Sequence, residues 1–418
     1  NNDTQLFYFW IDLPMGSCIE VKMFSKTSRK KTLIIIFLTF ASLLGFPIIA
    51  PALPSVRDAF NISTSDIGLV MAAYSAPGII FIPIMGLLAD RYGKKRVLVP
   101  SMLLFALGGS ACAIAQDTET LLLFRFFQGI GACALATINV SWAVDLFEND
   151  ERIKIMGYIG ATQNIGSGIL PIIGGFLASL AWFYPFLVTL LVLPLGFYLL
   201  IFMEEKSQEK NSKSINPKNF ISYAWQHLND KIVIEIVFMT GAFIFIGFGA
   251  LITYLPIFLK DTFNTPEIII GIIVGFRAVM GVITATRLAT ISKYFSYRII
   301  IFVSFLVLAA GMITIPYANN QWFVLFTSMC YGGAFGLLRP SLQYLLLEHA
   351  PINLRSTFAS ASNFGLRLSQ TLSPIFAGLY LTFGSFKGLY ILATILAIFM
   401  ALFSLTATSL RVERSNPN

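Results

Sequence analysis

Long apolar runs separated by short polar segments divide the chain almost from end to end. A run of about 18 or more apolar residues is long enough to cross a bilayer as a helix. Such runs cover twelve segments: 33–54, 66–88, 97–116, 121–144, 155–178, 181–203, 232–258, 267–290, 298–317, 321–347, 356–381 and 385–408. The pattern therefore predicts an all-α membrane protein with twelve transmembrane helices.

One polar segment, 204–231, is much longer than the others and separates six spans from six. Its Lys, Glu, Asn and Ser content cannot bury a core, so we expect a flexible or partly amphipathic connector. The predicted units are a disordered N-terminal cytoplasmic segment, two six-helix bundles joined by this linker, and a tail: 1–32, 33–203, 204–231, 232–408 and 409–418. Residues 1–22, which begin with Asn, look like a propeptide, an expression scar or an upstream extension and are excluded from the fold.

Composition excludes several classes of protein. Hydrophobic residues make up 56% of the 418 residues and charged residues only 12%, whereas soluble domains have about 45–50% and about 25%. Four cysteines without CxxC spacing and two histidines argue against a structural zinc site. With no catalytic Ser/His/Asp set, metal cluster or phosphate loop in the sequence, we expect neither an enzyme nor a cofactor.

Positive charge is strongly sided. If the N-terminus is inside, 22 of the 29 Lys and Arg residues fall in cytoplasmic segments and three fall outside; the remaining four, Arg125, Arg277, Arg339 and Arg367, lie within spans. Because short cytoplasmic loops are enriched in Lys and Arg, both termini are predicted to be cytoplasmic in a multi-pass protein of the plasma membrane. This sidedness accounts for the net charge of +8 without any nucleic-acid partner.

The two halves are related by an internal repeat. A shift of 203 residues aligns acidic, amide and glycine positions in corresponding loops and spans: Asp58 with Asp261, Asn61 with Asn264, Gly68 with Gly271, Gly78 with Gly281, Gly129 with Gly332, Arg152 with Arg355, Pro171 with Pro374, and Gly175 with Gly378. Two parallel repeats are typical of secondary transporters that bind substrate at the midplane between the halves.

The loop between the second and third spans carries a specific pattern of glycine, acidic and basic residues, formed by Gly86, Asp90, Arg91, Gly93, Lys94, Lys95 and Arg96. It resembles the G-x-L-a-D-R-x-G-r-k-r motif of the major facilitator superfamily, whose organisation covers about residues 30–410. The resemblance implies a conformational latch in which Asp90 docks near Ser356 and Thr357 when the cytoplasmic side closes. Arg91 and Asp145 are expected to complete the charge cluster. The second half lacks an equivalent Asp and Gly.

Two further motifs resemble those of the same superfamily. In the fourth span, Arg125, Gln128 and Gly129 resemble an RxxQG motif whose Arg is implicated in proton coupling; the alternative is an arginine that snorkels to the interface. In the fifth span, small residues and a proline resemble the family's antiporter motif, with Leu170 in place of one glycine: Gly157, Gly166, Pro171, Gly174 and Gly175. Such a glycine-rich face permits close helix packing.

Arg277 and Arg367 lie about 15 Å into their spans, near the bilayer centre. No Asp or Glu occupies the central part of any span, so the substrate would supply the anion. Capping of helix carbonyls or of nearby amides, or a role in proton coupling, are the alternatives. Arg339 is expected nearer the cytoplasmic interface. Candidate substrate contacts near mid-span are Arg277, Arg367, Gln163, Asn164, Asn363 and Gln370.

The leading interpretation is a monomeric, proton-driven antiporter that exports small organic molecules, drug-like or natural-product and possibly anionic. An organic-anion exchanger or a proton symporter for uptake are alternatives within transport. A transporter-like receptor is the alternative outside it. Without a core carboxylate, the coupled proton would use Asp145 or Glu235 at a span edge, Arg125 with water, or the substrate itself. The expected partners are the small-molecule substrate and the lipid bilayer.

Overall fold

The structure is a computed structural model that describes residues 26–202, 230–350 and 355–410. Within these ranges the chain is almost entirely helical and has no strand. The first half contains α1 (Lys26–Leu43), η1 (Ala50–Ala52), α2 (Leu53–Phe60), α3 (Gly68–Ser75), α4 (Pro77–Tyr92), α5 (Lys94–Ala111), η2 (Cys112–Ile114), α6 (Thr118–Leu146), α7 (Asn149–Leu180), α8 (Tyr184–Leu187), η3 (Val188–Leu191) and α9 (Val192–Phe202).

The second half contains α11 (Lys231–Ile246), the π-helix η4 (Gly247–Thr253), α12 (Tyr254–Phe263), α13 (Glu267–Gly275), α14 (Arg277–Tyr294), α15 (Tyr297–Thr314), η5 (Ile315–Tyr317), η6 (Gln321–Phe323), α16 (Val324–His349), α17 (Arg355–Leu381), α18 (Phe386–Thr406) and η8 (Thr408–Leu410). Most of the predicted linker, residues 1–25 and the tail from 411 lie outside the described residues.

Nine helical segments in the described part of the chain are long and apolar enough to cross a membrane. The other three predicted spans are helical but differ in character. The first, α1, opens with four basic residues. The sixth is the shorter apolar stretch Tyr184–Leu199. The eleventh, α17, is rich in Ser, Asn, Arg and Gln over residues 355–370, as expected for a helix that lines a polar region rather than lipid.

Two of the predicted spans depart from regular α-helix near their middle, where a tyrosine packs directly against a glycine. A side chain at Gly45 would lie within 1.9 Å of the Tyr74 hydroxyl, and one at Gly247 within 2.0 Å of the Tyr331 ring. At these points α1 gives way to turns, and α11 gives way to the π-helix η4. The helix predicted over 33–54 is therefore interrupted by turns, whereas the helix predicted over 232–258 is continuous and contains a π-helical stretch.

The internal repeat is visible in the backbone and in the packing. Asn61 and Asn264, 203 residues apart, both end a helix in the left-handed conformation, with φ of 52° and 51°. The repeat also pairs the helices that join the halves. A Cβ at Gly271 would lie 2.3 Å from the Pro171 carbonyl oxygen, and a Cβ at Gly68 would lie 2.7 Å from the Pro374 carbonyl oxygen.

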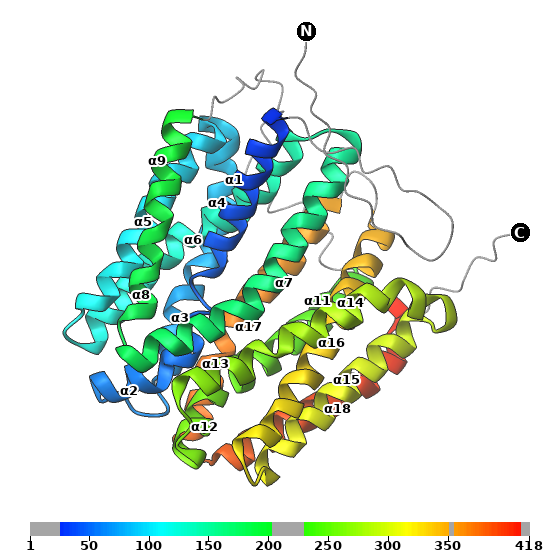
Figure 1. The fold of residues 1–418 in the computed structure, drawn as a ribbon. Coiled ribbons are helices and arrows are strands. Elements are labelled where there is room, and N and C mark those ends of the chain that lie inside the picture. The colour runs from blue at the N-terminus through cyan, green and yellow to red at the C-terminus, as the bar shows by residue number, and fades with distance from the viewer. Residues whose placement is uncertain (1–25, 203–229, 351–354, 411–418) are drawn as a thin grey trace, which may run out of the picture.

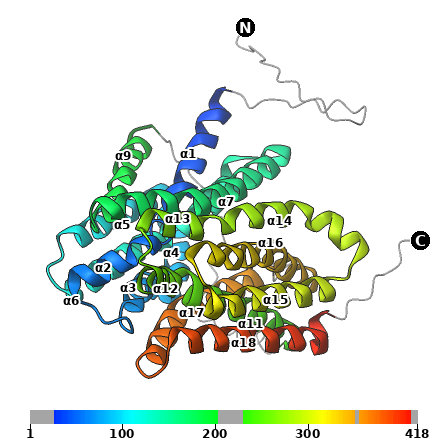
Figure 2. The same cartoon turned by 60° about the horizontal axis from the view of Figure 1, so that its bottom comes forward.

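The two halves lie side by side, with α3, α4 and α7 of the first facing α13, α14 and α17 of the second. Figure 1 shows the first half in blue to green and the second in yellow-green to red. In Figure 2, α13 and α14 run along α7. We call the end that carries Lys94, Arg96 and Arg152 the basic end, and the end that carries Arg57 and Asp261 the opposite end.

Candidate functional site

Arg125 is enclosed within the first half by three helical segments. Its Nε donates to the Val70 carbonyl oxygen at 3.1 Å, one terminal nitrogen to Gln128 Oε1 at 2.6 Å, and the other to the Gly45 carbonyl oxygen at 3.0 Å. The guanidinium also lies 4.5 Å from the centre of the Tyr74 ring. Because Arg125 is 0% exposed, the snorkelling alternative is wrong. The guanidinium is held by oxygen atoms and an aromatic face, with no carboxylate among them.

The repeat places different chemistry at the matching positions of the second half. Arg277 corresponds to Tyr74, and Tyr331 corresponds to Gln128. A Cβ at Gly129 would lie 2.2 Å from the Tyr74 carbonyl oxygen, and one at Gly332 would lie 1.9 Å from that of Arg277. The second half thus has a cation where the first has a tyrosine, and a tyrosine where the first has a glutamine, on equivalent backbone.

Arg277, Arg339 and Tyr331 form one group in the second half. The charges of both arginines act on Tyr331, which is itself buried, and Tyr331 stacks on Phe243 at 5.3 Å. The Nε of Arg277 is buried and lacks a hydrogen-bond partner among the described residues. Arg339 lies 6.0 Å from the Phe335 ring and within electrostatic range of Arg367. Arg339 is half-buried and lies about two turns beyond Tyr331 along α16, toward the basic end, so its place nearer the cytoplasmic interface stays a prediction.

Arg367 extends from α17 to the boundary between the halves. It donates to Gln370 Oε1 at 3.1 Å on its own helix, and its Cδ would lie 3.1 Å from a Cβ at Gly78 of α4. One turn further along α17, Thr371 Oγ1 donates to Ser75 Oγ at 3.1 Å, a hydrogen bond that joins the halves. Arg367 is thus one of the second-half cations that faces the first half directly.

No carboxylate forms an ion pair with Arg277, Arg339 or Arg367 within the described ranges. Glu235 is buried but is occupied at the basic end of α11, where it accepts from Thr408 Oγ1 at 3.0 Å and from the Ser409 N–H at 2.8 Å. The three arginines are half-buried, and a guanidinium held away from water normally requires an anion or oxygen acceptors. The group therefore has the electrostatics of a site for a negatively charged ligand.

Of the four amide side chains predicted to contact substrate, only Gln370 hydrogen-bonds to one of these arginines. Gln370 binds Arg367, as described above. Asn164 donates to the Gly160 carbonyl oxygen of its own helix at 3.0 Å. Gln163 on α7 and Asn363 on α17 are exposed, and neither hydrogen-bonds to Arg277 or Arg367. Aromatic residues that the sequence did not single out also meet across the boundary: Phe46 of the first half and Phe248 of the second pack edge to face, with ring centroids 4.8 Å apart.

The predicted latch is assembled differently from expectation. Gly93 turns between α4 and α5 with a φ of 97°, a conformation that favours glycine. Asp145 forms an ion pair with Lys94, while Arg91 packs on Tyr92 at 5.4 Å. Asp90 is exposed, and the side chains of Ser356 and Thr357 lie outside the described residues. A Cβ added at Gly86 would meet nothing within 4 Å, so no other described helix packs closely against this glycine.

The predicted antiporter motif lies on α7 and faces two partners. Gly166 and Gly174 lie against the first half itself, where added Cβ atoms would meet Leu43 at 2.5 Å and the Ile48 carbonyl oxygen at 1.9 Å. Pro171 and Gly175 lie against α13 of the second half, and a Cβ at Gly175 would be 2.2 Å from the Glu267 carbonyl oxygen. The motif therefore packs α7 within its bundle and also against the other bundle.

Contact between the halves decreases toward the basic end. Along α7, a Cβ at Gly168 would lie 2.9 Å from Ala278, but nothing described lies within 4 Å of one at Gly160 or Gly157. Along α4, the contact at Gly78 is likewise absent at Gly86. The halves are joined at the opposite end and separate toward the basic end.

Hydrogen bonds and ion pairs close the opposite end. Arg57 bonds Asp261 at 2.8 Å across the boundary, and donating this hydrogen bond raises the pKa of Arg57 above its ordinary value. Ser55 Oγ donates to Glu267 Oε1 at 2.9 Å, and the Tyr254 hydroxyl donates to the Ser65 carbonyl oxygen at 2.9 Å. Each of these three contacts joins a residue of the first half to one of the second.

The family model described as Major Facilitator Superfamily matches residues 35–374, and again 237–418. The chain belongs to the major facilitator superfamily. The solved structures agree in fold. The inward-open xylose transporter XylE from E. coli has a TM-score of 0.72 at 16% identity, covering 91% of this chain and 96% of that one. A bacterial homolog of the human lysosomal transporter Spinster has a TM-score of 0.75 at 14% identity, covering 92% and 98%.

Two curated relatives of this superfamily are similar over most of their length. The quinolone resistance protein NorA of Staphylococcus aureus (strain COL) is 26% identical over 360 residues, which are 84% of this chain and 89% of the relative. The bacillibactin exporter of Bacillus subtilis (strain 168) is 26% identical over 393 residues, 89% and 95% respectively.

Two tyrosines of the site, Tyr74 and Tyr331, were not predicted from the sequence. Tyr74 and Tyr331 lie in apolar runs, where an aromatic residue gives no local signal of function. The repeat was the signal that could have found them, because the shift that aligns the motif glycines also aligns Tyr74 with Arg277 and Gln128 with Tyr331. Lys94, rather than the expected Arg91, is the cation of the loop that pairs with Asp145.

Proposed function

We propose that the chain exports small organic molecules across the plasma membrane by alternating access, in exchange for protons. Two relatives of similar length are, by their names, a resistance protein for quinolones and an exporter of bacillibactin. The fifth-span motif on α7, which resembles the antiporter motif, supports the same direction of transport. Positive charge in the loops assigns the basic end to the cytoplasm.

The main support for this proposal is that the contacts between the halves decrease from the opposite end to the basic end. The halves are hydrogen-bonded at the opposite end and separate toward the basic end, and the arginine and tyrosine group lies between these levels. Such an arrangement suits a state that admits a ligand from the cytoplasm. Rocking of one bundle against the other would then expose the same group to the outside.

The substrate class follows from charge and apolar surface. Three arginines without carboxylate partners favour a carboxylate, phosphate or sulfonate on the substrate. Phe335, Tyr331 and Phe248 nearby favour an apolar or aromatic body on the same molecule. We therefore propose an amphipathic organic anion as the preferred substrate.

Proton coupling requires a group that can release a proton, and a guanidinium cannot do so. Arg125 would act by exchanging its oxygen partners when the halves move, with Gln128 as the partner on the same helix. The proton itself would be carried by Asp145, by Glu235 or by the substrate's own acidic group. Neither a cofactor nor a second subunit is needed in this scheme.

Transport in proteoliposomes of known orientation tests the proposal. An imposed proton gradient should drive accumulation of an amphipathic organic anion against its concentration gradient, and a protonophore should abolish it. A neutral analogue of the same size is the matched ligand, and protein-free liposomes are the control. Gradient-independent uptake that responds only to internal unlabelled anion would instead establish anion exchange.

Anion exchange is the second candidate, and the unneutralised arginines favour it. An exchanger needs cations that are always charged, and the described part of the arginine group contains no acidic group that would titrate with it. Net accumulation without internal anion separates the two candidates: an imposed proton gradient drives it in a proton antiporter, while a strict exchanger needs an internal anion and does not respond to the gradient. A receptor of transporter fold would bind ligand and show neither activity.

A further inference from the structure

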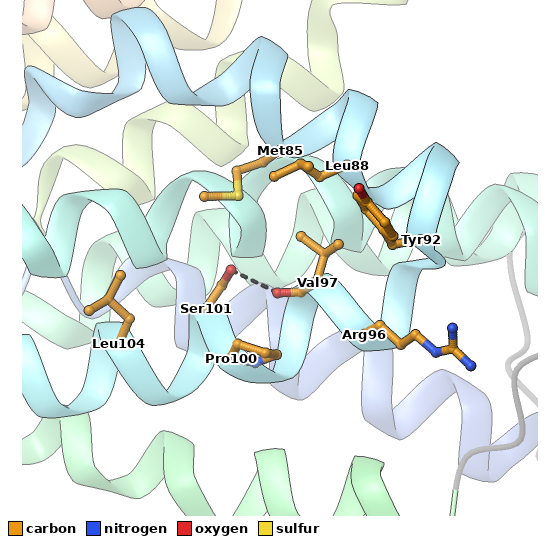
Figure 3. Close-up of a pocket in the computed structure, with 8 residues that line it drawn as sticks. All are labelled: Met85, Leu88, Tyr92, Arg96, Val97, Pro100, Ser101 and Leu104. Carbon is orange, nitrogen blue, oxygen red and sulfur yellow. Dashed lines mark hydrogen bonds between the residues drawn. The ribbon is translucent and has the colours of Figure 1, made fainter. Parts of the chain in front are cut away.

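A groove of about 490 Å³ lies within the first half, between α4 and α5 near the basic end. Figure 3 shows the residues that line it: Met85, Leu88, Tyr92, Arg96, Val97, Pro100, Ser101 and Leu104. Arg125, Arg277, Arg339 and Arg367 are not among them. It is therefore separate from the candidate substrate site.

The walls of the groove suit a hydrocarbon chain rather than a polar molecule. Its inner part is formed by Met, Leu, Val and Pro side chains. Pro100 has no N–H, and the Ser101 hydroxyl is already bonded to the Val97 carbonyl oxygen at 2.8 Å, the dashed line in Figure 3. Leu87 and Leu103, on the same two helices, are 47% and 46% exposed, as expected for surface in contact with lipid.

The groove follows the helix axes, and so the membrane normal. From Arg96 at one end to Leu104 at the other, eight residues of α5 span about 12 Å at 1.5 Å per residue. One leaflet of the hydrocarbon core is about 15 Å deep. The groove thus has the direction and nearly the depth of an acyl chain anchored at the membrane surface.

Arg96 lies at the end of the groove nearest the membrane surface. The Arg96 side chain lines the groove with its stem, and Figure 3 shows the guanidinium directed away from the apolar part. Arg96 is exposed and has no hydrogen bond or ion pair with any residue that the structure describes. Lys94 by contrast pairs with Asp145, and Arg91 packs on Tyr92. Arg96 is therefore available for a phosphate at headgroup level.

We infer that this groove binds one anionic phospholipid from the leaflet at the basic end. One acyl chain lies between α4 and α5 as far as Leu104, and the phosphate is paired with Arg96 beside the Tyr92 ring. The inference concerns lipid and stands independently of what the protein transports.

Lipid binding to the purified full chain tests it. Native mass spectrometry in a neutral detergent would compare phosphatidylglycerol with phosphatidylcholine of the same acyl chains, measuring the affinity of the first bound lipid. Arg96→Gln should weaken phosphatidylglycerol binding about fivefold, the effect of one cation at the membrane surface. It should weaken phosphatidylcholine binding less, because the choline cation already offsets the charge of that lipid's phosphate. Arg287→Gln is the matched control, because Arg287 is an exposed arginine near the same end in the other half.

Leu104→Trp would fill the groove and should weaken binding of both lipids. If that variant does not fold, a phosphatidylglycerol with a photoreactive acyl chain gives the second measurement on the unmodified protein, with cross-links expected at Met85, Leu88 or Leu104. Equal binding of the two lipids, equal losses in Arg96→Gln and Arg287→Gln, or cross-links confined to other helices would each overturn the inference.

Discussion

At the residue scale, the arginines in the membrane divide into two kinds according to their partners. Arg125 has oxygen acceptors for all three of its nitrogens, so it holds α3, α6 and the turn after α1 together. Arg277 retains an unpartnered buried nitrogen. The first kind contributes to the stability of a bundle, and the second is available to a ligand. This difference decides what substitution of each should do.

Arg125→Ala should destabilise the first half by about 1–3 kcal/mol for each buried acceptor that it leaves without a partner. Arg125→Lys should recover only part of this stability, since one ammonium cannot reach the Gly45, Val70 and Gln128 oxygens together. Thermal unfolding of the purified variants measures the effect. Gln128→Ala, which removes one of the three acceptors, should fall between the Lys variant and the unmodified protein. Unchanged unfolding of Arg125→Ala would contradict this structural role.

Arg277→Gln and Arg367→Gln should each weaken binding of an anionic substrate about tenfold, or about 1.4 kcal/mol, by removing one charge-assisted contact. Binding of a neutral analogue should change little. Lys at either position should restore part of the affinity, because it keeps the charge but loses the planar pair of donors. Equilibrium binding to the purified protein provides the measurement. An unchanged affinity for the anion in the double Gln variant would remove the proposed role.

At the element scale, α7 shows how much of the site could be predicted from the sequence. The spacing of its glycines predicted a closely packed helix, and the contacts of Gly166, Gly174 and Gly175 confirm close packing. The spacing gave no indication of which partner each glycine faces, because glycines of both faces recur at helical intervals. Gly168, outside the motif, contacts the second half as closely as motif members do. Partner choice depends on tertiary packing.

Three Gly→Ala substitutions along α7 should therefore have three different outcomes. Gly174→Ala should prevent folding of the first half, because its Cβ would lie 1.9 Å from the Ile48 carbonyl oxygen within the same bundle. Gly175→Ala should leave the bundle folded but favour separation of the halves at the opposite end, since its clash is with Glu267. Gly157→Ala should be tolerated and gain up to about 1 kcal/mol in helix propensity. Expression, unfolding and accessibility measurements distinguish them, and equal behaviour of Gly174→Ala and Gly175→Ala would contradict the assignment of faces.

At the scale of the whole molecule, the repeat made the fold predictable, whereas the arrangement of the two halves was not. Twelve spans in two bundles follow from hydropathy and the shift of 203 residues. The state in which the halves rest depends on contacts between loop ends, such as Arg57 with Asp261, that carry no periodicity.

The predicted latch at Asp90 is expected to form in the state in which the basic end is closed. Asp90 makes no hydrogen bond or ion pair with any residue described here, in a structure whose halves are apart at that end. Asp90→Asn should therefore leave thermal stability of this state unchanged and reduce turnover about tenfold, by weakening the state in which the basic end is closed. Glu148→Gln, an exposed acid at the same end, is the control for charge alone. Transport at the unmodified rate in Asp90→Asn would contradict the latch.

The ion pair between Arg57 and Asp261 at the opposite end can be tested with Asp58, the equivalent residue of the first half, as the control. Asp58 and Asp261 are equivalent positions, and both bond Arg57, at 3.0 and 2.8 Å. Asp58 shares a helix with Arg57, whereas Asp261 lies across the boundary. Only loss of Asp261 removes a contact that opening must break. Because a partly exposed pair contributes about 0.2–1 kcal/mol, Asp261→Asn should raise the population open at this end about threefold, and Asp58→Asn should not.

Reaction of a cysteine at position 75 with a membrane-impermeant thiol reagent measures that population. Ser75 is 2% exposed and its hydroxyl meets Thr371 across the boundary, so Ser75→Cys should react from that side only when the halves part. Cys112, Cys133 and Cys330 are buried and would be replaced beforehand, together with Cys18. Adding Glu267→Gln should increase the rate further, because Ser55 then loses a charged acceptor on the second half. If Asp58→Asn accelerates labelling as much as Asp261→Asn, the effect comes from the charge of Arg57 alone, and the pair does not hold the halves together.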